Sequence, residues 1–468
     1  MTHRLRRRWR LYLLSLCLPF TLLAAIDLGL RAAGVVTPED PLLFHVRTYD
    51  LNFSPFVESD DGFVSIRPDW ISRGEALRET IGTRAGRYFL YPGFRPCRFQ
   101  KEKQVGATRI FALGGSTTFG LHVGQDGAFA ALIEQRLRPV LPNRRVEVIN
   151  LGCPGWASGR VHNLLETVLQ LEPDLLIIYC GHNEMLEGHL GSRPKLGFLG
   201  LARASVISAS TLAGWLNHAV SARFRDRSHE MISEDAAALE AGRIPTYDPE
   251  GLPAEQQRRP EQQFFDAAAS QFAANLEAMV ERTRSAGVPA IFVLPVRNLL
   301  QPPSISAYDQ DTQRVNERTS LVRRAEQMLT RGRAEDGLNL LNAATELSPD
   351  HAMTRYLRGT ALLRLGRRPE AESDFLAACD LDVRTHRITS QLESSMIATV
   401  ERANSKWIDL RSRFHPDLSV ASAKKLFVDH VHPTRLGHQI IAESLMPRVI
   451  EHLRIDAPSP TENNTGAP

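Results

Sequence analysis

Cysteine is scarce in this chain of 468 residues, and its five cysteines follow no metal-binding spacing. They are Cys17, Cys97, Cys153, Cys180 and Cys379, and no two of them form a CxxC pair. A structural zinc site and a disulfide framework therefore have no support in the sequence. One isolated disulfide stays open as an alternative, because a single bridge in an oxidising compartment needs no motif. We expect no structural metal.

The chain also lacks a marked charge excess and a phosphate-binding glycine loop. Its formal net charge is +3, which gives no electrostatic reason to expect nucleic acid as a partner. The stretch RIFALGGSTTFG (109–120) is rich in glycine, but Leu121 follows Gly120 where a P-loop needs lysine. The dinucleotide pattern GxGxxG is absent too. These absences leave two interpretations of Ser116 in this stretch: a helix cap or a nucleophile at a strand end.

Long apolar runs are missing from the body of the chain, and the N-terminus carries a shorter one. The basic start MTHRLRRRWR precedes 16 uncharged residues, 11–26. A spanning helix needs about 20 residues, and residues 28–30 extend the run beyond Asp27. A cleaved signal peptide and an uncleaved anchor both fit this pattern. We favour a signal anchor within residues 1–30, with the rest of the chain extracytoplasmic, in the periplasm or at the cell surface.

Five short apolar segments alternate with helix patterns and predict a parallel sheet between two helix layers. We expect a three-layer α/β/α, flavodoxin-like fold with a five-stranded sheet. The strand candidates are the apolar run that opens the stretch 109–120, followed by 146–152, 174–181, 288–296 and 407–410. In such sheets, ligands bind beyond the carboxyl ends of the strands. Ser116, Gly152 and Asn183 all lie at or just past a predicted strand end.

Residues 315–385 contain an internal repeat of period 34. Its alignment sets Ala325 against Gly359 and Ala344 against Ala378. The segment resembles the tetratricopeptide repeat, which implies an all-α insertion with a groove for a protein partner. A purely structural insertion that packs on the rest of the chain stays open as the alternative.

Three further segments carry little chemical signal. Residues 31–105 predict a small membrane-proximal mixed or β-rich segment. For 190–265, an active-site lid, a substrate wall, a membrane-lying helix and a packed helix all remain alternatives. The tail, 456–468, has the composition of a disordered segment.

The stretch DHVHPT near the C-terminus places Asp429 and His432 three residues apart, before a helix expected from about Pro433. Side chains at this spacing can share one side of the chain. A carboxylate there fixes the imidazole tautomer, so that the other ring nitrogen can take a proton from a hydroxyl. His430 is the local competitor for this role, and His438 is expected on the helix surface.

Together these motifs resemble the SGNH, or GDSL-like, hydrolase family over about residues 105–190 and 270–450. GGSTTFG matches the first block, NLGCPG the second, GHNE the third and DHVHPT the fifth. The first block has glycine where aspartate usually precedes the serine, and Glu184 replaces the commoner aspartate of the third. The resemblance implies a hydrolase domain in two parts, 106–300 and 386–455, separated by the helical insertion.

The resemblance also assigns the roles of the site residues. It implies Ser116 as nucleophile, His432 as base and Asp429 as its orienter, with an oxyanion hole formed by the N–H groups of Ser116 and Gly152 and the amide of Asn183. For Asn183, a helix cap is the alternative. No cofactor and no metal is required.

The expected function is that of an extracytoplasmic serine esterase that cleaves acyl or acetyl esters through an acyl-enzyme. The substrate would be an ester-bearing small molecule, or a glycan or lipid of the cell envelope. An O-acyltransferase that uses the same residues on an exported polysaccharide is one alternative. A catalytically inert scaffold that binds a protein partner through the helical repeat is the other.

Overall fold

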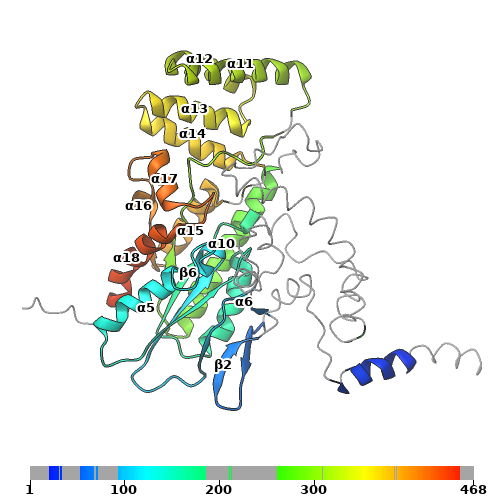
Figure 1. Cartoon of the computed structure of the whole chain (residues 1–468), viewed down its shortest axis with the longest axis vertical. Helices are drawn as coiled ribbons and strands as arrows, with labels where there is room; N and C mark the ends of the chain where they lie inside the picture. The colour runs from blue at the N-terminus through cyan, green and yellow to red at the C-terminus, as the bar shows by residue number, and fades with distance from the viewer. Residues whose placement is uncertain are drawn as a thin grey trace, which may run out of the picture. The chain divides into compact units, whose positions relative to one another are not determined.

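The computed structural model describes the chain in several ranges (Figure 1). They are residues 21–30, 32–33, 53–67, 70–71, 93–185, 210, 212, 261–307, 309–383, 385 and 387–453. The chain divides into two compact units, each described by itself. The first comprises Met1–Tyr49, Pro68–Tyr91 and Ser192–Pro245; the second comprises Asp50–Arg67, Pro92–Gly191 and Thr246–Pro468.

In the first unit, residues 21–30 are helical, and Asp27 Oδ1 accepts the N–H of Leu212 at 2.9 Å. Within the described ranges, no helix combines the length and the apolar character needed to cross a membrane. Residues 1–20 of the predicted anchor lie outside the described residues, as do nearly all of 190–265 and the whole tail, 456–468.

The second unit is built on a five-stranded parallel sheet, as the alternating pattern predicted. Its strands have the order β5-β4-β6-β7-β8. They are β4 (Thr108–Gly114), β5 (Val146–Gly152), β6 (Leu175–Tyr179), β7 (Ala290–Val293) and β8 (Lys406–Ile408). Every residue of β4 and β6 is buried, because helices cover both faces of the sheet. β6 and β7 end before the predicted segments do, since the residues that follow turn into loops.

Helices form a layer on each side of this sheet (Figure 1). One layer contains α5 (Phe129–Val140), α16 (Arg411–Phe414), α17 (Val420–Leu426) and α18 (Arg435–His452), and shares a core with β4, β6 and β7. The other contains α6 (Ser158–Leu169), α10 (Gln262–Ser285) and α15 (Ser390–Arg402). The predicted three-layer arrangement is therefore present.

One expectation for α18 was wrong. His438, expected on the surface of this helix, is fully buried. Its Nδ1 accepts the N–H of Phe129 at 3.3 Å, and its ring stacks on the Phe129 ring. α18 packs against α5, so a polar position that looked exposed in the sequence faces the start of another helix.

The described part of residues 31–105 includes a small antiparallel sheet of β1 (Phe56–Glu58), β2 (Phe63–Ile66) and β3 (Arg98–Gln100). The buried Arg109 of β4 links it to the large sheet. Its guanidinium donates to the carbonyl of Gln100 at 2.7 Å and to Glu147 at 2.9 Å. Phe99 of β3 packs edge-on against Phe111 of β4.

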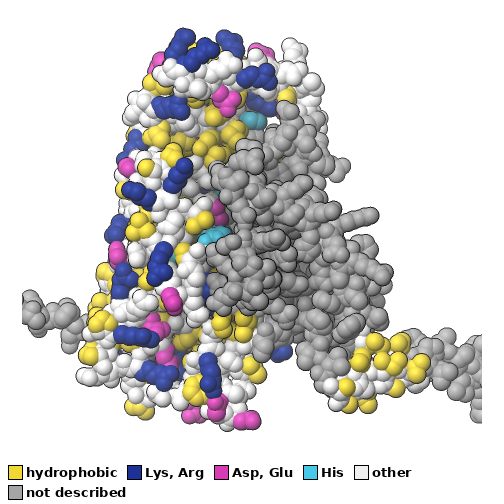
Figure 2. Space-filling view, in the orientation of Figure 1, with side chains coloured by type: hydrophobic (Ala, Val, Ile, Leu, Met, Phe, Trp, Pro, Cys, Tyr) yellow, Lys and Arg dark blue, Asp and Glu magenta, His cyan; other side chains and the backbone are white. Residues whose placement is uncertain are grey.

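Between β7 and α15, the period-34 segment forms two helical hairpins. They consist of α11 (Thr312–Thr330), α12 (Ala334–Leu347), α13 (Ala352–Arg364) and α14 (Arg368–Asp380), each packed on the next. A Cβ placed on Gly359 would lie 3.0 Å from the Phe375 ring, so a small residue stands where α13 and α14 cross. Figure 2 shows basic side chains distributed over the outside of this stack. Leu299 and Leu418, from outside the hairpins, share their apolar core.

Candidate active site

The nucleophile turn, which contains Gly115 and Ser116, follows directly from β4. Ser116 is the first residue of α4 (Ser116–Phe119), a four-residue helix whose N-cap position is Gly115, with no side-chain cap. The buried Arg95 supports the far end of α4, where its Nη2 donates to the carbonyl of Gly120 at 2.9 Å and its guanidinium lies over the Phe119 ring. Because Ser116 lies inside α4 and no side chain caps the helix, the Ser116 hydroxyl is not a helix cap.

The base loop, residues 427–434, contains Asp429 and His432 and joins α17 to α18. A bridge between Phe427 and Pro433 closes it, and Val428 N–H donates to the carbonyl of His432 at 2.8 Å. Asp429 Oδ1 accepts the backbone N–H groups of Val431 at 3.0 Å and His432 at 2.9 Å. These bonds use one carboxylate oxygen to shape the loop and leave Oδ2 for the imidazole.

Ser116, His432 and Asp429 form a continuous hydrogen-bonded chain. Ser116 Oγ lies 2.7 Å from His432 Nε2, and His432 Nδ1 lies 2.6 Å from Asp429 Oδ2. Burial favours the neutral acid at Asp429, but His432 and the two backbone N–H groups outweigh it and hold the carboxyl pKa well below its usual range. An ionised Asp429 accepts a hydrogen bond from the Nδ1–H of His432, so the unprotonated Nε2 faces Ser116 and can take its proton.

His430, the competing histidine, does not join this chain. Its Nε2 lies 3.5 Å from Ser304 Oγ. Its carbonyl accepts the N–H of Asn298 at 2.8 Å, and Asn298 Nδ2 donates to the carbonyl of Asp429 at 3.1 Å. The loop after β7 thus holds the base loop through Asn298. Sequence reasoning missed this residue, because it belongs to none of the recognised motifs.

A buried ion pair supports Asn298 in turn. Arg387 Nη1 donates to the carbonyls of Asn298 at 3.2 Å and Gln301 at 2.9 Å. Its Nη2 pairs with Asp382 at 3.3 Å, and the side chains are 0% and 1% exposed. Asp382 follows α14, so the end of the helical insertion and the base loop belong to one hydrogen-bonded network.

The amide of Asn183 lies beside the nucleophile turn. Its Nδ2 donates to the carbonyl of Trp156 at 3.0 Å, and a Cβ placed on Gly115 would meet this nitrogen at 3.1 Å. One amide hydrogen is therefore engaged and the other is left for an oxyanion. Trp156 is fixed by Phe53 and Phe94, whose rings pack edge-on against it.

The structure corrects the assignment of Gly152 to the oxyanion hole. Its N–H already donates to Asn150 Oδ1 at 2.9 Å, and Asn150 Nδ2 donates to the carbonyl of Thr118 at 2.7 Å. A Cβ at Gly152 would lie 2.0 Å from the backbone nitrogen of Phe119. Gly152 therefore serves the close approach of β5 to α4.

Gly155, three residues farther along the same NLGCPG motif, is a second candidate donor. Its φ of 78° is left-handed, and its N–H has no hydrogen-bond partner among the described residues. It directly precedes Trp156, whose carbonyl holds the Asn183 amide. The signal in the sequence was the second glycine of the motif, which marks the turn after β5.

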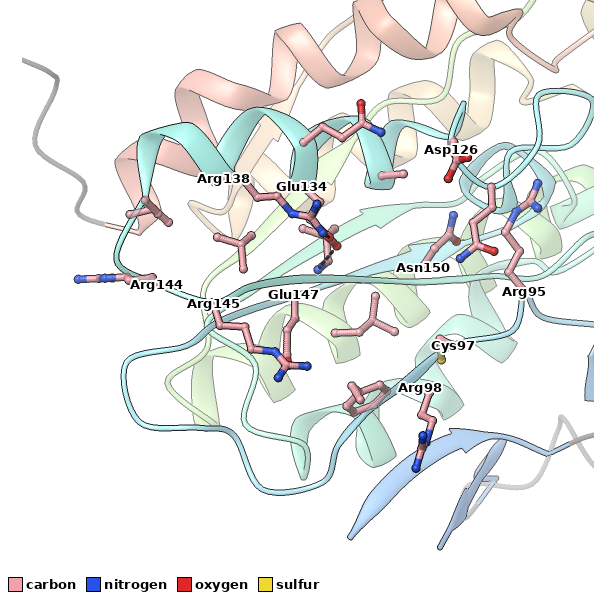
Figure 3. A pocket seen from close by; sticks show the side chains of 18 of the residues that line it. Arg95, Cys97, Arg98, Asp126, Glu134, Arg138, Arg144, Arg145, Glu147 and Asn150 are labelled. Carbon is pink, nitrogen blue, oxygen red and sulfur yellow. Dashed lines mark hydrogen bonds and ion pairs between the residues drawn. The ribbon is translucent and has the colours of Figure 1, made fainter. Parts of the chain in front are cut away.

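A separate cavity of about 690 Å³ lies along β5 and α5 (Figure 3). Asn150 and Arg95 line the part nearest α4. Within it, Glu134 accepts the N–H of Val148 at 3.0 Å, which covers part of the open edge of β5. No member of the Ser116–His432–Asp429 chain lines this cavity, so it is not the reaction site.

A sequence model of the GDSL-like lipase/acylhydrolase family matches residues 112–361, more than half of the chain. The matched segment contains Ser116 and Asn183 but ends before the base loop. No curated protein matches the chain.

Solved structures show a distant similarity. An acetylxylan esterase from Geobacillus stearothermophilus is 13% identical with a TM-score of 0.33, over 74% of this chain and 96% of that one. LAE5, an α/β hydrolase from the metagenome of Lake Arreo, Spain, is 12% identical with a TM-score of 0.32, over 73% and 94%. The acetyl xylan esterase AlAXEase is 11% identical with a TM-score of 0.34, over 73% and 100%.

Proposed function

Because this chain belongs to the GDSL-like lipase/acylhydrolase family, we propose that it is a serine esterase whose catalytic residues are Ser116, His432 and Asp429. The observation that carries the proposal is the unbroken chain of short hydrogen bonds from Ser116 Oγ through His432 to Asp429. This arrangement activates a hydroxyl for attack on an acyl carbon.

In the first half of the reaction, His432 Nε2 takes the proton of Ser116 as Oγ bonds to the ester carbonyl carbon. Asp429 stabilises the resulting imidazolium through Nδ1. The carbonyl oxygen becomes an oxyanion, for which the N–H groups of Ser116 and Gly155 and the free amide hydrogen of Asn183 are the donors. The tetrahedral intermediate then collapses, and His432 gives its proton to the departing alcohol.

In the second half, water attacks the acyl-enzyme. His432 takes one proton from this water, and the same donors stabilise the second oxyanion. The carboxylic acid leaves, and the proton returns to Ser116 Oγ. All proton transfers use one imidazole, so the mechanism needs only the groups already named.

The substrate class and location belong to the same proposal. The substrate is an acyl or acetyl ester on a cell-envelope glycan or lipid, and the enzyme works outside the cytoplasm, anchored through residues 1–30. The basic start and the apolar run after it support this location. For the two helical hairpins, whose repeat resembles the tetratricopeptide type, we propose a protein partner.

Covalent labelling tests the catalytic assignment without knowledge of the substrate. We expect a fluorophosphonate to modify the full chain at Ser116 alone, as mapped by peptide mass. Ser116→Ala should abolish the adduct. His432→Ala should slow labelling and lower the hydrolysis of p-nitrophenyl acetate by about 10³- to 10⁶-fold.

His430→Ala is the matched control, because it removes a histidine of the same loop that lies outside the hydrogen-bonded chain. It should label and hydrolyse at the wild-type rate. A folded wild-type protein that forms no adduct would refute the esterase and favour a binding scaffold. Acyl transfer to an added glycan acceptor in preference to water would replace the esterase with a transferase.

A further inference from the structure

His122 lies beside the catalytic triad of Ser116, His432 and Asp429 and takes no part in the proposed reaction. It follows the nucleophile turn in a left-handed conformation, with φ of 72°. For a residue with a Cβ, this conformation is strained, and such strain is concentrated at functional sites. Its side chain remains 37% exposed. A partly exposed imidazole on a strained backbone therefore lies beside Asp429 and His432.

Three ligand atoms converge at this point. His122 Nε2 lies 3.8 Å from Asp429 Oδ2, and His432 Nδ1 lies 2.6 Å from the same oxygen. One ligand atom from each of the three residues lies within 4.8 Å of the other two. The two imidazole rings meet edge to face, with centroids 5.4 Å apart. Among the described residues, this is the one such group of three.

We propose that His122, Asp429 and His432 bind a divalent transition-metal ion, Zn²⁺ in the first place, and that this ion switches the triad off. Two imidazoles and one carboxylate suit Zn²⁺, which takes such ligands at about 2.0–2.2 Å and leaves a fourth position for water. Mg²⁺ and Ca²⁺ prefer oxygen ligands and should not compete. Binding needs the His432–Asp429 hydrogen bond to open slightly around the ion.

The inhibition, which rests on the proposed function, follows from the tautomer of His432. In the active chain Nδ1 carries the proton, and Nε2 accepts from Ser116. When a metal bonds to Nδ1, the Nδ1 proton is lost to solvent and Nε2 takes one up, so the ring stays neutral and no net proton is released. Nε2–H then donates to Ser116 Oγ. The base is removed without any change in the nucleophile.

Cobalt absorption tests binding separately from catalysis. Full-chain Ser116→Ala, which has no esterase activity under the proposal, is titrated with Co²⁺ and followed by the visible bands of tetrahedral Co²⁺. We expect one equivalent to bind and Zn²⁺ to displace it. Adding His122→Ala should weaken binding at least about tenfold, since the loss of even an outer partner costs 10- to 100-fold. His430→Ala should leave binding unchanged.

Inhibition is measured on the enzyme with an intact Ser116. Zn²⁺ should reduce hydrolysis reversibly, EDTA should restore it, and His122→Ala should raise the inhibitory concentration at least about tenfold relative to its own metal-free rate. Co²⁺ binding that does not respond to His122→Ala, or the absence of tetrahedral bands, would overturn the site. If the Co²⁺ bands appear and depend on His122, but the protein with an intact Ser116 shows no esterase activity in the absence of metal, the metal site stands and the proposed function fails.

Discussion

Asn183 connects two loops at the level of single atoms. One amide hydrogen holds the Trp156 carbonyl, and the nitrogen lies against Gly115, immediately before the nucleophile. The second amide hydrogen of Asn183 is a candidate donor to an oxyanion. Asn183 follows β6, and Ser116 lies in the turn after β4, so this role requires the two loops to stay in contact. Asn183 is thus both a structural donor and a candidate catalytic donor, and the two roles can be separated by kinetics.

We predict that Asn183→Ala lowers kcat for p-nitrophenyl acetate by about 10²- to 10³-fold with little change in KM, because the lost donor acts mainly in the transition state. Asn163→Ala, at a buried asparagine of α6 outside the site, is the control and should keep its kcat. A lower kcat that is accompanied by a lower melting temperature, with labelling of Ser116 unaffected, would assign Asn183 to the structural role alone.

For single residues, the sequence predicted which residue types form the site better than it predicted the directions in which their hydrogen-bonding groups point. Ser116, Asp429 and His432 were identified because family blocks tie each residue to a strand end or helix start. Gly152 was misassigned because a motif does not show which way a backbone N–H points. That direction depends on the side chain of Asn150, which takes this N–H, and on the backbone of Phe119 against which Gly152 packs.

Among the larger elements, the base loop depends on support from outside its own helices. Its internal bonds shape the turn, but Asn298 fixes it to the loop after β7 with one backbone and one side-chain donor. Asn298 is 7% exposed, and its Oδ1 accepts the N–H of Leu300 at 3.1 Å. It is therefore a positioning residue for Asp429.

We predict that Asn298→Ala lowers kcat about tenfold and leaves KM nearly constant, since a small displacement of the base disturbs proton transfer more than binding. Fluorophosphonate labelling should slow in proportion. Ser304→Ala, which removes only the contact to the His430 side chain, is the control. A variant that loses stability but labels at the wild-type rate would show that Asn298 acts on folding and not on the base.

The elements themselves were largely readable from periodicity. β4 and β6 are buried on both faces, and so β6 and residues 110–113 of β4 appear in the sequence as apolar runs. The three-stranded sheet of β1, β2 and β3 was predicted only as a mixed or β-rich segment, because its strands are three or four residues long. Its pairing depends on tertiary contacts such as those of Arg109, which leave no local pattern.

In the molecule as a whole, neutral histidines buried far from solvent couple stability to pH. Burial above all, together with the charge of His432, lowers the pKa of His182 and of His438 to about 3. The unfolded chain titrates these groups near 6.5. Between these values the unfolded state binds more protons, so the free energy of unfolding rises with pH and falls on acidification.

We predict that the free energy of unfolding decreases by about 1.4 kcal/mol per pH unit for each of these two histidines as the pH falls from about 6 to 4. His438→Gln, which keeps an acceptor for the Phe129 N–H, should reduce this slope by one histidine's share. Urea unfolding at a series of pH values measures the slope of the free energy of unfolding against pH in both proteins. An unchanged slope in the variant would show that His438 becomes protonated in the native state.

The order of the site residues along the chain has a consequence for the time at which activity can first appear. Ser116 and His432 are separated by 316 positions, and the two helical hairpins lie between them. At about 5–20 residues per second, the ribosome finishes the nucleophile turn well before it makes the base. A nascent chain of this enzyme therefore carries an inert serine until another 316 residues have been added, and hydrolysis cannot begin before His432 has been translated.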